Sequence, residues 1–345
     1  MRVTAYRFSM WTRISAILLI FAILAPLCGC EAKSPKSQSV EFFTMDTVME
    51  LTAYGKNAGT ALHAAQAEII RLDRLLSISD PESEIYRANR DGFAELSGDT
   101  AALVRESLAL YELTGGAFDI TVYPLMDAWG FYSDEYRLPS DEERARLAGL
   151  VGSDRLALEG DALTLPEPGM GIDLGGIAKG YASDRAAETL ADNGVASALI
   201  SLGGNIVALG SKPDGMPWRV AIRDPLDENA FSGIVRVTDT AVVTSGGYER
   251  CFELDGKSYH HILDPATGLP ARNGLISVTI ICESGILADG LSTALYVMGE
   301  EKALAFWRAH LELFDAVLVT DDGRVLVTSG IAEAFSSERD FEVVR

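Results

Sequence analysis

Apolar residues recur along this chain with the spacings of amphipathic helices and of buried strands. Over Ala58–Leu76, the side chains Leu62, Ala65, Ile69 and Leu72 follow the helical spacing. Glycines suited to a helix end follow two further segments, at Gly115-Gly116 and at Gly194. We therefore predict helices at Ala58–Leu76, Thr100–Thr114, Glu142–Leu150, Ala178–Asp192, Ala288–Met298 and Glu301–His310.

Short apolar runs between these helices predict strands, mostly in the middle and the last third of the chain. They are Val48–Tyr54, Ala196–Leu202, Ile206–Leu209, Trp218–Ile222, Gly233–Val237, Thr240–Thr244, Ile276–Cys282 and Ala316–Val319. Helices and strands interleave without a regular β–α–β alternation, which favours an α+β fold over a doubly wound sheet. The part from Glu41 onward has no internal repeat, and about 300 residues is near the upper limit of one domain.

The amino terminus predicts export. Three arginines precede the apolar run Ile14–Leu27, which is too short for a comfortable membrane span. The run ends in Leu27-Cys28-Gly29-Cys30, which resembles a bacterial lipobox with Cys30 as the lipidated residue. We expect a signal peptide at 1–29, a lipidated flexible tether at 30–41 and one folded domain at 42–340. An ordinary signal peptide or an N-terminal anchor is the alternative. Either way, the mature protein is expected outside the cytoplasmic membrane, lipid-anchored on its outer side or periplasmic.

Charge narrows the set of partners. The formal charge is −21, and loss of the three arginines in 1–29 would make it −24. Such an acidic domain argues against nucleic acid and against electrostatic adhesion to anionic lipid. With Cys28 removed and Cys30 lipidated, two of the four cysteines are left, Cys251 and Cys282. Their pairing cannot be deduced from sequence, and we expect two buried free thiols.

The segment Asp173-Leu-Gly-Gly-Ile-Ala-Lys-Gly180 is the first candidate for chemistry. Glycines at a loop-to-helix junction let backbone N–H groups approach phosphates, and the helix dipole favours the anion there. The segment matches neither a P-loop nor a Rossmann turn. A tight turn that begins a surface helix is the alternative reading.

Two further clusters carry polar side chains. Two of the chain's four histidines, His260 and His261, are adjacent before an Asp-Pro loop, and neighbouring residues of an extended segment face opposite ways. In a helix, Asp289 and Thr293 would share one face and offer the hard oxygen ligands that Mg²⁺ prefers. A structural histidine and an ordinary helix cap are the simpler readings of these clusters.

Taken together, the clusters suggest metal-assisted chemistry on a phosphoanhydride. At this point the chain resembles the ApbE family, the FAD:protein FMN transferases. The resemblance covers 42–340 and rests on motifs in the family's order. They are Phe43-Thr-Met-Asp-Thr47, Ser83-Glu-Ile-Tyr-Arg-Ala-Asn89, Gly115-Gly-Ala-Phe-Asp-Ile-Thr121, Trp129-Gly-Phe131, Asp173–Gly180, Leu202-Gly-Gly-Asn205, Thr244-Ser-Gly-Gly247, His261-Ile-Leu-Asp-Pro-Ala-Thr-Gly268 and Ala288-Asp-Gly-Leu-Ser-Thr293.

This resemblance implies one T-fold-like α+β domain with largely antiparallel sheets and flanking helices. It implies that FMN is transferred from FAD to a Ser/Thr hydroxyl of another protein and that AMP leaves. His261 would be the general base. Mg²⁺, or Mn²⁺, would be held by Asp289, Thr293 and the carbonyl of Ala178, with Ser292 as an additional ligand. The flavin or nucleotide pocket would include Met45, Asn89, Ala117, Phe118, Asp119, Asp173, Lys179, Ser245 and Ile262.

The resemblance also implies acceptors, namely membrane-linked flavoproteins with a segment similar to Asp-x-x-Ser/Thr-Gly-Ala-Thr. Two other functions stay open: an FAD pyrophosphatase, in which water replaces the protein hydroxyl, and a non-catalytic FAD-binding lipoprotein. One departure from the family concerns the backbone. Asp46 stands where many relatives have glycine, so the local conformation there is expected to differ.

Overall fold

The computed structural model describes residues 36–133 and 135–345. The predicted signal peptide, Cys30 and the first residues of the predicted tether lie outside this part of the chain. Lys36–Arg345 forms one compact unit. Within it, no helix combines the length and the apolar character needed to cross a membrane.

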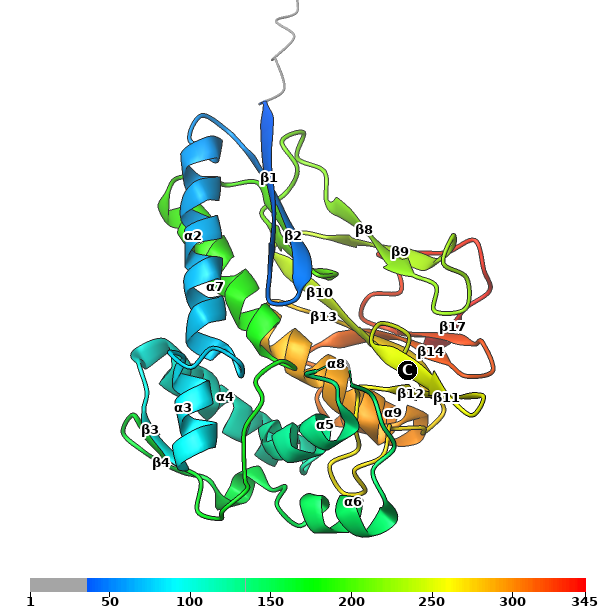
Figure 1. Ribbon diagram of the computed structural model, residues 1–345. Helices are drawn as coiled ribbons and strands as arrows, with labels where there is room; N and C mark the ends of the chain where they lie inside the picture. The colour runs from blue at the N-terminus through cyan, green and yellow to red at the C-terminus, as the bar shows by residue number, and fades with distance from the viewer. Residues whose placement is uncertain (1–35, 134) are drawn as a thin grey trace, which may run out of the picture. The chain divides into compact units, whose positions relative to one another are not determined.

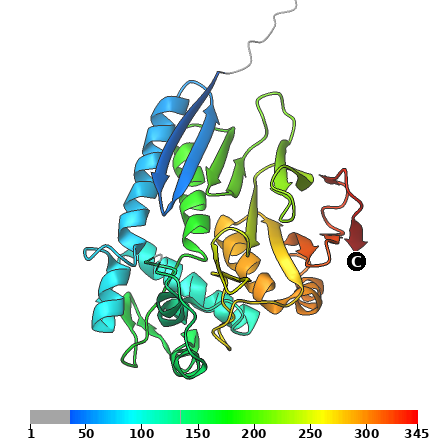
Figure 2. The same ribbon diagram turned by 45° about the vertical axis from the view of Figure 1, so that its right-hand side comes forward.

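The unit is built on a nine-stranded sheet whose order is β1-β2-β6-β7-β10-β13-β14-β15-β17. Neighbouring strands are antiparallel, except for the parallel pair β15 and β17. In Figure 2, the blue β1–β2 hairpin lies at one end of this sheet and the red C-terminal strands lie at the other. The strands are β1 (Ser37–Thr44), β2 (Thr47–Tyr54), β6 (Ala198–Leu202), β7 (Asn205–Leu209), β10 (Thr240–Gly246), β13 (Leu275–Cys282), β14 (Asp315–Thr320), β15 (Val325–Thr328) and β17 (Glu342–Val344).

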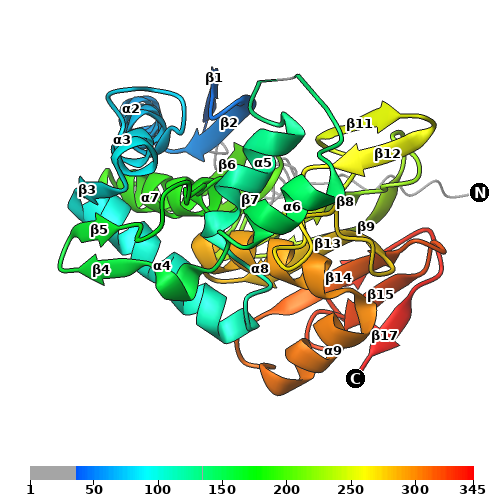
Figure 3. The same ribbon diagram turned by 60° about the horizontal axis from the view of Figure 1, so that its bottom comes forward.

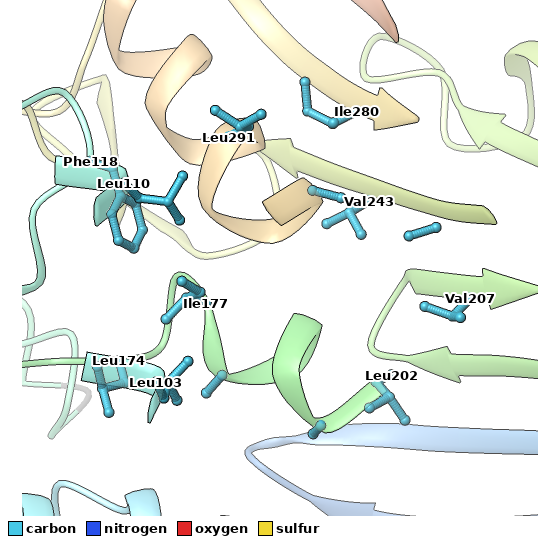
Figure 4. Close-up of a cluster of buried hydrophobic side chains, with 14 of the residues drawn as sticks. Leu103, Leu110, Phe118, Leu174, Ile177, Leu202, Val207, Val243, Ile280 and Leu291 are labelled. Atoms are coloured by element: carbon cyan, nitrogen blue, oxygen red, sulfur yellow. The ribbon is translucent and has the colours of Figure 1, made fainter. Parts of the chain in front are cut away.

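Helices cover one face of the sheet, and α2 and α7 run side by side next to the β1–β2 hairpin (Figure 1). These helices are α2 (Ala58–Leu76), α7 (Ala178–Asp192), α8 (Gly285–Met298) and α9 (Glu300–Ala309). Between helices and sheet lies the main apolar core. There Ile177 and Leu291 belong to the same buried cluster as Val243 and Ile280 of the central strands (Figure 4). This core fixes the ends of α7 and α8 relative to the sheet.

A small sheet in the order β16-β9-β8 packs on the other face through a second apolar cluster that includes Trp218, Val235 and Val317. The remaining elements lie in the lower part of Figure 1 and come forward in Figure 3. The small sheet contains β8 (Trp218–Arg223), β9 (Phe231–Val237) and β16 (Phe335–Ser336). The remaining elements are α3 (Glu84–Asp91), β3 (Phe93–Glu95), α4 (Gly98–Thr114), α5 (Tyr123–Trp129), α6 (Asp141–Ala148), β4 (Ala157–Glu159), β5 (Ala162–Thr164), β11 (Cys251–Leu254) and β12 (Lys257–His260). Short 3₁₀ turns lie at Ile120–Val122 and Ser153–Arg155.

The predicted α+β fold with largely antiparallel sheets is confirmed. Helices Ala58–Leu76 and Ala178–Asp192 match their predicted bounds, and the other predicted elements are shifted by a few residues. Two boundaries are wrong: residues 37–41 of the predicted tether belong to β1, and β17 lies past the predicted end of the domain at 340. The polar Ser37-Gln-Ser39 looks unstructured in sequence, but its backbone pairs with Ala53 and neighbouring residues of β2.

The prediction for the cysteines was half right. Both are free, and Cys282 is buried, with burial raising the pKa of its thiol to about 12. Cys251 is exposed: it begins β11 of a two-stranded hairpin that, in the described part of the chain, pairs with no other strand, and it is the neighbouring Phe252 that packs against Trp129 and Phe131. An apolar run in the sequence therefore did not mean a buried strand here.

The turn between β1 and β2 has an unusual backbone. Its two central residues, Met45 and Asp46, have φ of 48° and 57°, which is the left-handed region that favours glycine. A two-residue hairpin turn with positive φ at both positions is a type I′ turn. Asp46 thus adopts a backbone conformation that glycine would adopt without steric cost.

We expect Asp46→Gly to stabilise the protein by about 0.5–1 kcal/mol, because glycine adopts this conformation without the steric cost that a Cβ brings. Asp46→Ala should destabilise it, since alanine keeps the Cβ and lacks a polar side chain that tolerates the left-handed region. Chemical denaturation of both variants measures the difference. If both variants changed stability equally, backbone strain at this turn would not be the cause.

Candidate active site

Segments far apart in the sequence meet around a cavity of about 500 Å³, which lies in the size range of small-molecule sites. The β1–β2 turn, the start of α7, the end of β10, the loop after β12 and one face of α8 all contribute. The lining residues are Met45, Asp46, Thr47, Ala117, Phe118, Asp119, Val122, Met126, Asp173, Gly175, Gly176, Lys179, Gly203, Asn205, Arg223, Thr244, Ser245, Gly246, Glu249, Arg250, His261, Ile262, Leu263, Asp289 and Thr293.

The turn that leads into α7 is held by Asp173. One carboxylate oxygen accepts from the amide of Gly175 at 2.8 Å, and the other accepts from the hydroxyl of Tyr132 at 2.7 Å. Among the described residues, the amides of Gly176 and Lys179 have no hydrogen-bond acceptor. These two N–H groups at the helix N-terminus therefore remain available to an anion such as a phosphate.

Asp289 lies where α8 crosses α7. A Cβ on Gly180 would come within 2.3 Å of the Gly285 carbonyl oxygen and 2.7 Å of the Asp289 Cβ, so the crossing requires glycine at this position. Asp289 is 4% exposed, and its carboxylate accepts from the Gly180 amide at 2.8 Å and from Asn205 Nδ2 at 2.9 Å. The close approach of the two helices thus fixes the direction of this carboxylate.

A second aspartate fixes the start of α8. The carboxylate of Asp184, on α7, accepts from the amides of Gly285 at 2.8 Å and Ile286 at 3.0 Å. Burial raises the pKa of Asp184, and the hydrogen bonds at the helix N-terminus oppose this effect. Asp184 therefore holds the helix that carries Asp289 in its position against α7.

Hydroxyl groups surround Asp289. Ser245 Oγ lies 3.3 Å from Thr293 Oγ1 and 2.7 Å from Ser292 Oγ, and Ser292 donates to the backbone carbonyl of Asp289 at 2.8 Å. Among the described residues no cation forms an ion pair with Asp289, although buried carboxylates are normally paired or bind a metal. One uncompensated carboxylate beside neutral oxygens is a donor set that fits a hard cation such as Mg²⁺ or Mn²⁺.

No group of three or more His, Cys, Asp or Glu side chains suited to a metal ion occurs in the described ranges 36–133 and 135–345. A cation bound at Asp289 would therefore rely on hydroxyls, backbone carbonyls, water and the substrate for its other ligands. Mg²⁺ commonly binds in this way, through one or two carboxylates and substrate phosphates.

Three cations line the same cavity in a protein of net charge −21: Lys179, Arg223 and Arg250. Within the described part of the chain, none of them forms an ion pair with a carboxylate. Arg223 lies over the ring of Tyr248 at 5.7 Å, and Arg250 donates to the Phe131 carbonyl at 2.7 Å. Five carboxylates line the cavity as well, so these three cations offer positive charge to an anionic ligand locally and not across the whole cavity.

His261 and His260 point to different sides of the chain, as the alternation of an extended segment predicts. His261 lines the cavity, and its Nδ1 lies 3.2 Å from the carbonyl oxygen of Arg250. A carbonyl only accepts, so Nδ1 carries the proton and Nε2 keeps its lone pair. Burial, with Arg250 and Lys179 nearby, lowers the pKa of His261 to about 3, so the ring is neutral at physiological pH.

His260 lies away from this cavity. It is 8% exposed, its Nε2 bonds the Ala271 carbonyl at 3.0 Å, and its ring meets Tyr296 edge to face at 5.5 Å. It lines a separate cavity of about 540 Å³. Burial lowers the pKa of His260 to about 4, and its Nδ1 is buried without a hydrogen bond. These contacts indicate a structural histidine.

This pKa shift predicts how stability changes with pH. An unfolded histidine binds a proton below about pH 6.5, whereas folded His260 resists protonation down to about pH 4. The unfolded state therefore gains protons first, and stability falls as the pH drops from about 6.5 to 4, by a few kcal/mol. His260→Phe should be less stable at pH 8 but should lose less stability over this interval. Urea denaturation at several pH values measures both slopes, and equal slopes would contradict the assignment.

Most of the predicted site residues come together around the cavity. Eleven of them line it: Met45, Ala117, Phe118, Asp119, Asp173, Lys179, Ser245, His261, Ile262, Asp289 and Thr293. Asn89, Ala178 and Ser292 are not among the lining residues. The side-chain amide of Asn89 instead makes two hydrogen bonds with the backbone of Ile172, at 2.9 and 2.7 Å, and so supports the turn at Asp173.

Sequence reasoning missed several residues at the cavity. Arg223, Glu249 and Arg250 line it, and no motif pointed to them. Asn205 belongs to a motif that was recognised but not assigned, and its contact with Asp289 links residues 84 positions apart. Asp119 was predicted as a ligand-binding residue; it lines the cavity, and its carboxylate also accepts from the side chains of Thr121 and Ser153. A lone sequence gives no signal for such pairings.

These features define an enzyme-like site for a nucleotide-sized anion: free amides at a helix start, three cations, a buried carboxylate and a neutral histidine. A model described as the ApbE family matches residues 45–318. The chain belongs to the ApbE family.

Individual relatives agree with this assignment. The chain is 37% identical to the FAD:protein FMN transferase of Vibrio cholerae over 318 residues, which cover 89% of this chain and 94% of that relative. It is 32% identical to the FAD:protein FMN transferase of Escherichia coli K12, covering 80% and 84% of the two chains. Among solved structures, the ApbE protein of Thermotoga maritima superposes with a TM-score of 0.82 at 31% identity, covering 88% and 100%. The flavin transferase ApbE of Vibrio cholerae superposes with a TM-score of 0.75 at 33% identity, covering 84% and 96%.

Proposed function

We propose that this protein is an FAD:protein FMN transferase that moves FMN from FAD to a Ser/Thr hydroxyl of an acceptor flavoprotein and releases AMP. The observation that carries the proposal is the meeting of three groups in one cavity. They are the Asp289–Thr293 face of α8, the phosphate-accessible start of α7 and the neutral ring of His261. In a phosphoryl transfer, the α8 face would stabilise charge, the start of α7 would bind the anion and His261 would remove the proton.

The proposed reaction begins with FAD bound so that its pyrophosphate lies at the start of α7. The acceptor hydroxyl attacks the FMN phosphorus, the bond from this phosphorus to the AMP oxygen breaks, and FMN remains attached to the acceptor as a phosphoester. His261 Nε2 accepts the hydroxyl proton, since Nδ1 is held as a donor by the Arg250 carbonyl. Lys179 and Arg223 stabilise negative charge on the phosphates and on the departing AMP.

Asp289 and Thr293, with the carbonyl of Ala178 as a further ligand, would hold Mg²⁺ or Mn²⁺. The cation would supply charge neutralisation at the phosphoryl oxygens. Binding can be measured without turnover by titrating Mn²⁺ and following its electron paramagnetic resonance. Wild type should bind Mn²⁺ and Asp289→Asn should bind it far more weakly. Equal binding by both proteins would exclude Asp289 as a ligand.

The defining experiment uses residues 31–345, which contain the whole compact unit Lys36–Arg345. The protein is incubated with FAD, Mg²⁺ and a candidate acceptor domain, and a matched acceptor carries valine in place of the modified threonine. Mass spectrometry follows the acceptor, and chromatography follows AMP and FMN. The proposal predicts an FMN adduct on the threonine acceptor only, with one AMP formed per adduct.

Two other outcomes correspond to the alternative functions. AMP and free FMN without any adduct, over a panel of acceptors, would identify an FAD pyrophosphatase. FAD that stays intact and bound would identify a flavin-binding protein without catalysis. The uncompensated carboxylate at Asp289 and the cavity-facing His261 favour catalysis, because storage of FAD needs neither a metal ligand nor a base.

We also propose export and attachment to the membrane through a lipid on Cys30, which would place the cavity on the same side as membrane-linked acceptors. The support is the lipobox-like Leu27-Cys28-Gly29-Cys30. Labelling cells with a fatty-acid analogue should mark the wild-type protein and leave Cys30→Ser unlabelled. Cys28→Ser is the matched control and should still be labelled. Loss of label in the control alone would contradict the assignment.

A further inference from the structure

One face of the β1–β2 hairpin is apolar and solvent-exposed. Among the described residues, Phe43 has the largest exposed fraction of any large apolar side chain, 70%, and Val48 is 54% exposed. The two residues are directly opposite each other in the hairpin, so their side chains share a face. The alternate residues Met49 and Leu51 point the other way and are fully buried. Single exposed apolar residues are normal on protein surfaces, whereas Phe43 and Val48 adjoin each other on one face.

The next outward pair along the hairpin is acidic. Glu41 is directly opposite Glu50, and both are exposed. Like charges in this arrangement repel, and within residues 36–133 and 135–345 neither forms an ion pair. The hairpin face, defined by Phe43, Val48, Glu41 and Glu50, would therefore be stabilised by a partner with an apolar side chain next to a basic one.

The hairpin face lies at the rim of the cavity. The chain from Phe43 to Val48 passes through the turn residues Met45, Asp46 and Thr47, and all three line the cavity. The small sheet β16-β9-β8 packs on the outward side of the sheet through strands such as β10 and β14. This cover reaches the hairpin only at Tyr54, which packs against Trp218 at the far end of β2 from the turn, and the hairpin lies at one end of the sheet (Figures 1 and 2).

We propose that the hairpin face is the docking surface for the acceptor flavoprotein. This inference rests on the proposed function, which requires a protein to bring its hydroxyl to the cavity. A domain that packs on Phe43 and Val48 has its nearest loop beside the β1–β2 turn. The acceptor is expected to present an apolar residue and a Lys or Arg near its modified hydroxyl, in keeping with this enzyme's charge of −21.

The test compares Phe43→Ser and the double variant Glu41→Lys/Glu50→Lys with wild type. Leu311→Ser is the control, since Leu311 is 58% exposed in the turn before β14, far along the sheet order from β1. FAD affinity is measured by flavin fluorescence, and FMN transfer is measured over a range of acceptor concentrations. We expect each hairpin variant to raise the KM for the acceptor about tenfold, with FAD affinity and kcat at saturating acceptor unchanged. Leu311→Ser should match wild type.

Charge reversal sharpens this test. Replacing the acceptor's basic residue by Glu should weaken transfer by wild type and restore transfer by the double Lys variant. An unchanged acceptor KM in both hairpin variants would overturn the proposal. So would a change of oligomeric state in Phe43→Ser without a change in KM, because the face would then bind a second copy of this chain. A wild-type enzyme that binds FAD but modifies no acceptor would instead refute the proposed function.

Discussion

Asp289→Ala should lower the rate of FMN transfer about a thousandfold, because loss of a cation that stabilises phosphoryl charge removes several kcal/mol of transition-state stabilisation. The carboxylate is buried, is oriented by Gly180 and Asn205, and has no cationic partner among the described residues. The rate is measured as adduct formation at saturating FAD and acceptor. Raising the Mg²⁺ concentration should not restore it.

The alanine variant also leaves two buried donors without an acceptor, at a cost of about 1–3 kcal/mol each. Asp289→Asn is therefore the matched variant. Its amide oxygen can still accept from the Gly180 amide, so it should unfold closer to wild type while transferring FMN as poorly as the alanine variant. If Asp289→Asn kept most of the activity, the carboxylate would have no role in charge stabilisation.

His261→Ala should slow the transfer about 10²–10⁴-fold with little change in FAD affinity, as expected for loss of a general base. The lowered pKa of about 3 adds a pH prediction. Protonation would inactivate the base, but it begins only near pH 3–4, so His261 should cause no loss of rate between about pH 6 and 8. Single-turnover rates over this interval measure the effect.

Two controls separate catalysis from structure. His63→Ala changes an exposed histidine on α2 and should leave the rate unchanged. Imidazole added to the medium should partly restore His261→Ala, since the variant leaves space where Nε2 lay. If the acceptor KM or FAD affinity accounted for the whole loss, His261 would be a binding residue and not a base.

Local sequence signals predicted the helices and the central strands well. The spacing of Leu62, Ala65, Ile69 and Leu72 describes one helix face, and all four are buried against the core. The signal failed where burial is set by a distant partner. β1 pairs its polar residues with β2, and in the β11–β12 hairpin Phe252 packs against Trp129 and Phe131 whereas the neighbouring Cys251 is exposed. Hydrophobic pattern predicts an element only when one of its faces meets the core.

Motifs located most of the site because its residues occur in short contiguous segments. They did not identify what fixes the geometry. Gly180 is needed for a helix crossing, and Asn205 at the start of β7 reaches Asp289 on α8. Asn89 supports the Asp173 turn through the backbone of Ile172. Such contacts form only once the chain has folded, and a single sequence contains no pattern that predicts them.

The most direct test of the proposed reaction is FMN transfer carried out in water labelled with a heavy isotope of oxygen. Direct attack by the acceptor hydroxyl on the FMN phosphorus predicts an acceptor adduct and AMP that both lack the label. Asp289→Ala should form both products about a thousandfold more slowly. Label in the phosphate of free FMN, with no adduct, would show that water is the nucleophile. Label in the AMP phosphate would show attack at the other phosphorus and would contradict the proposed reaction.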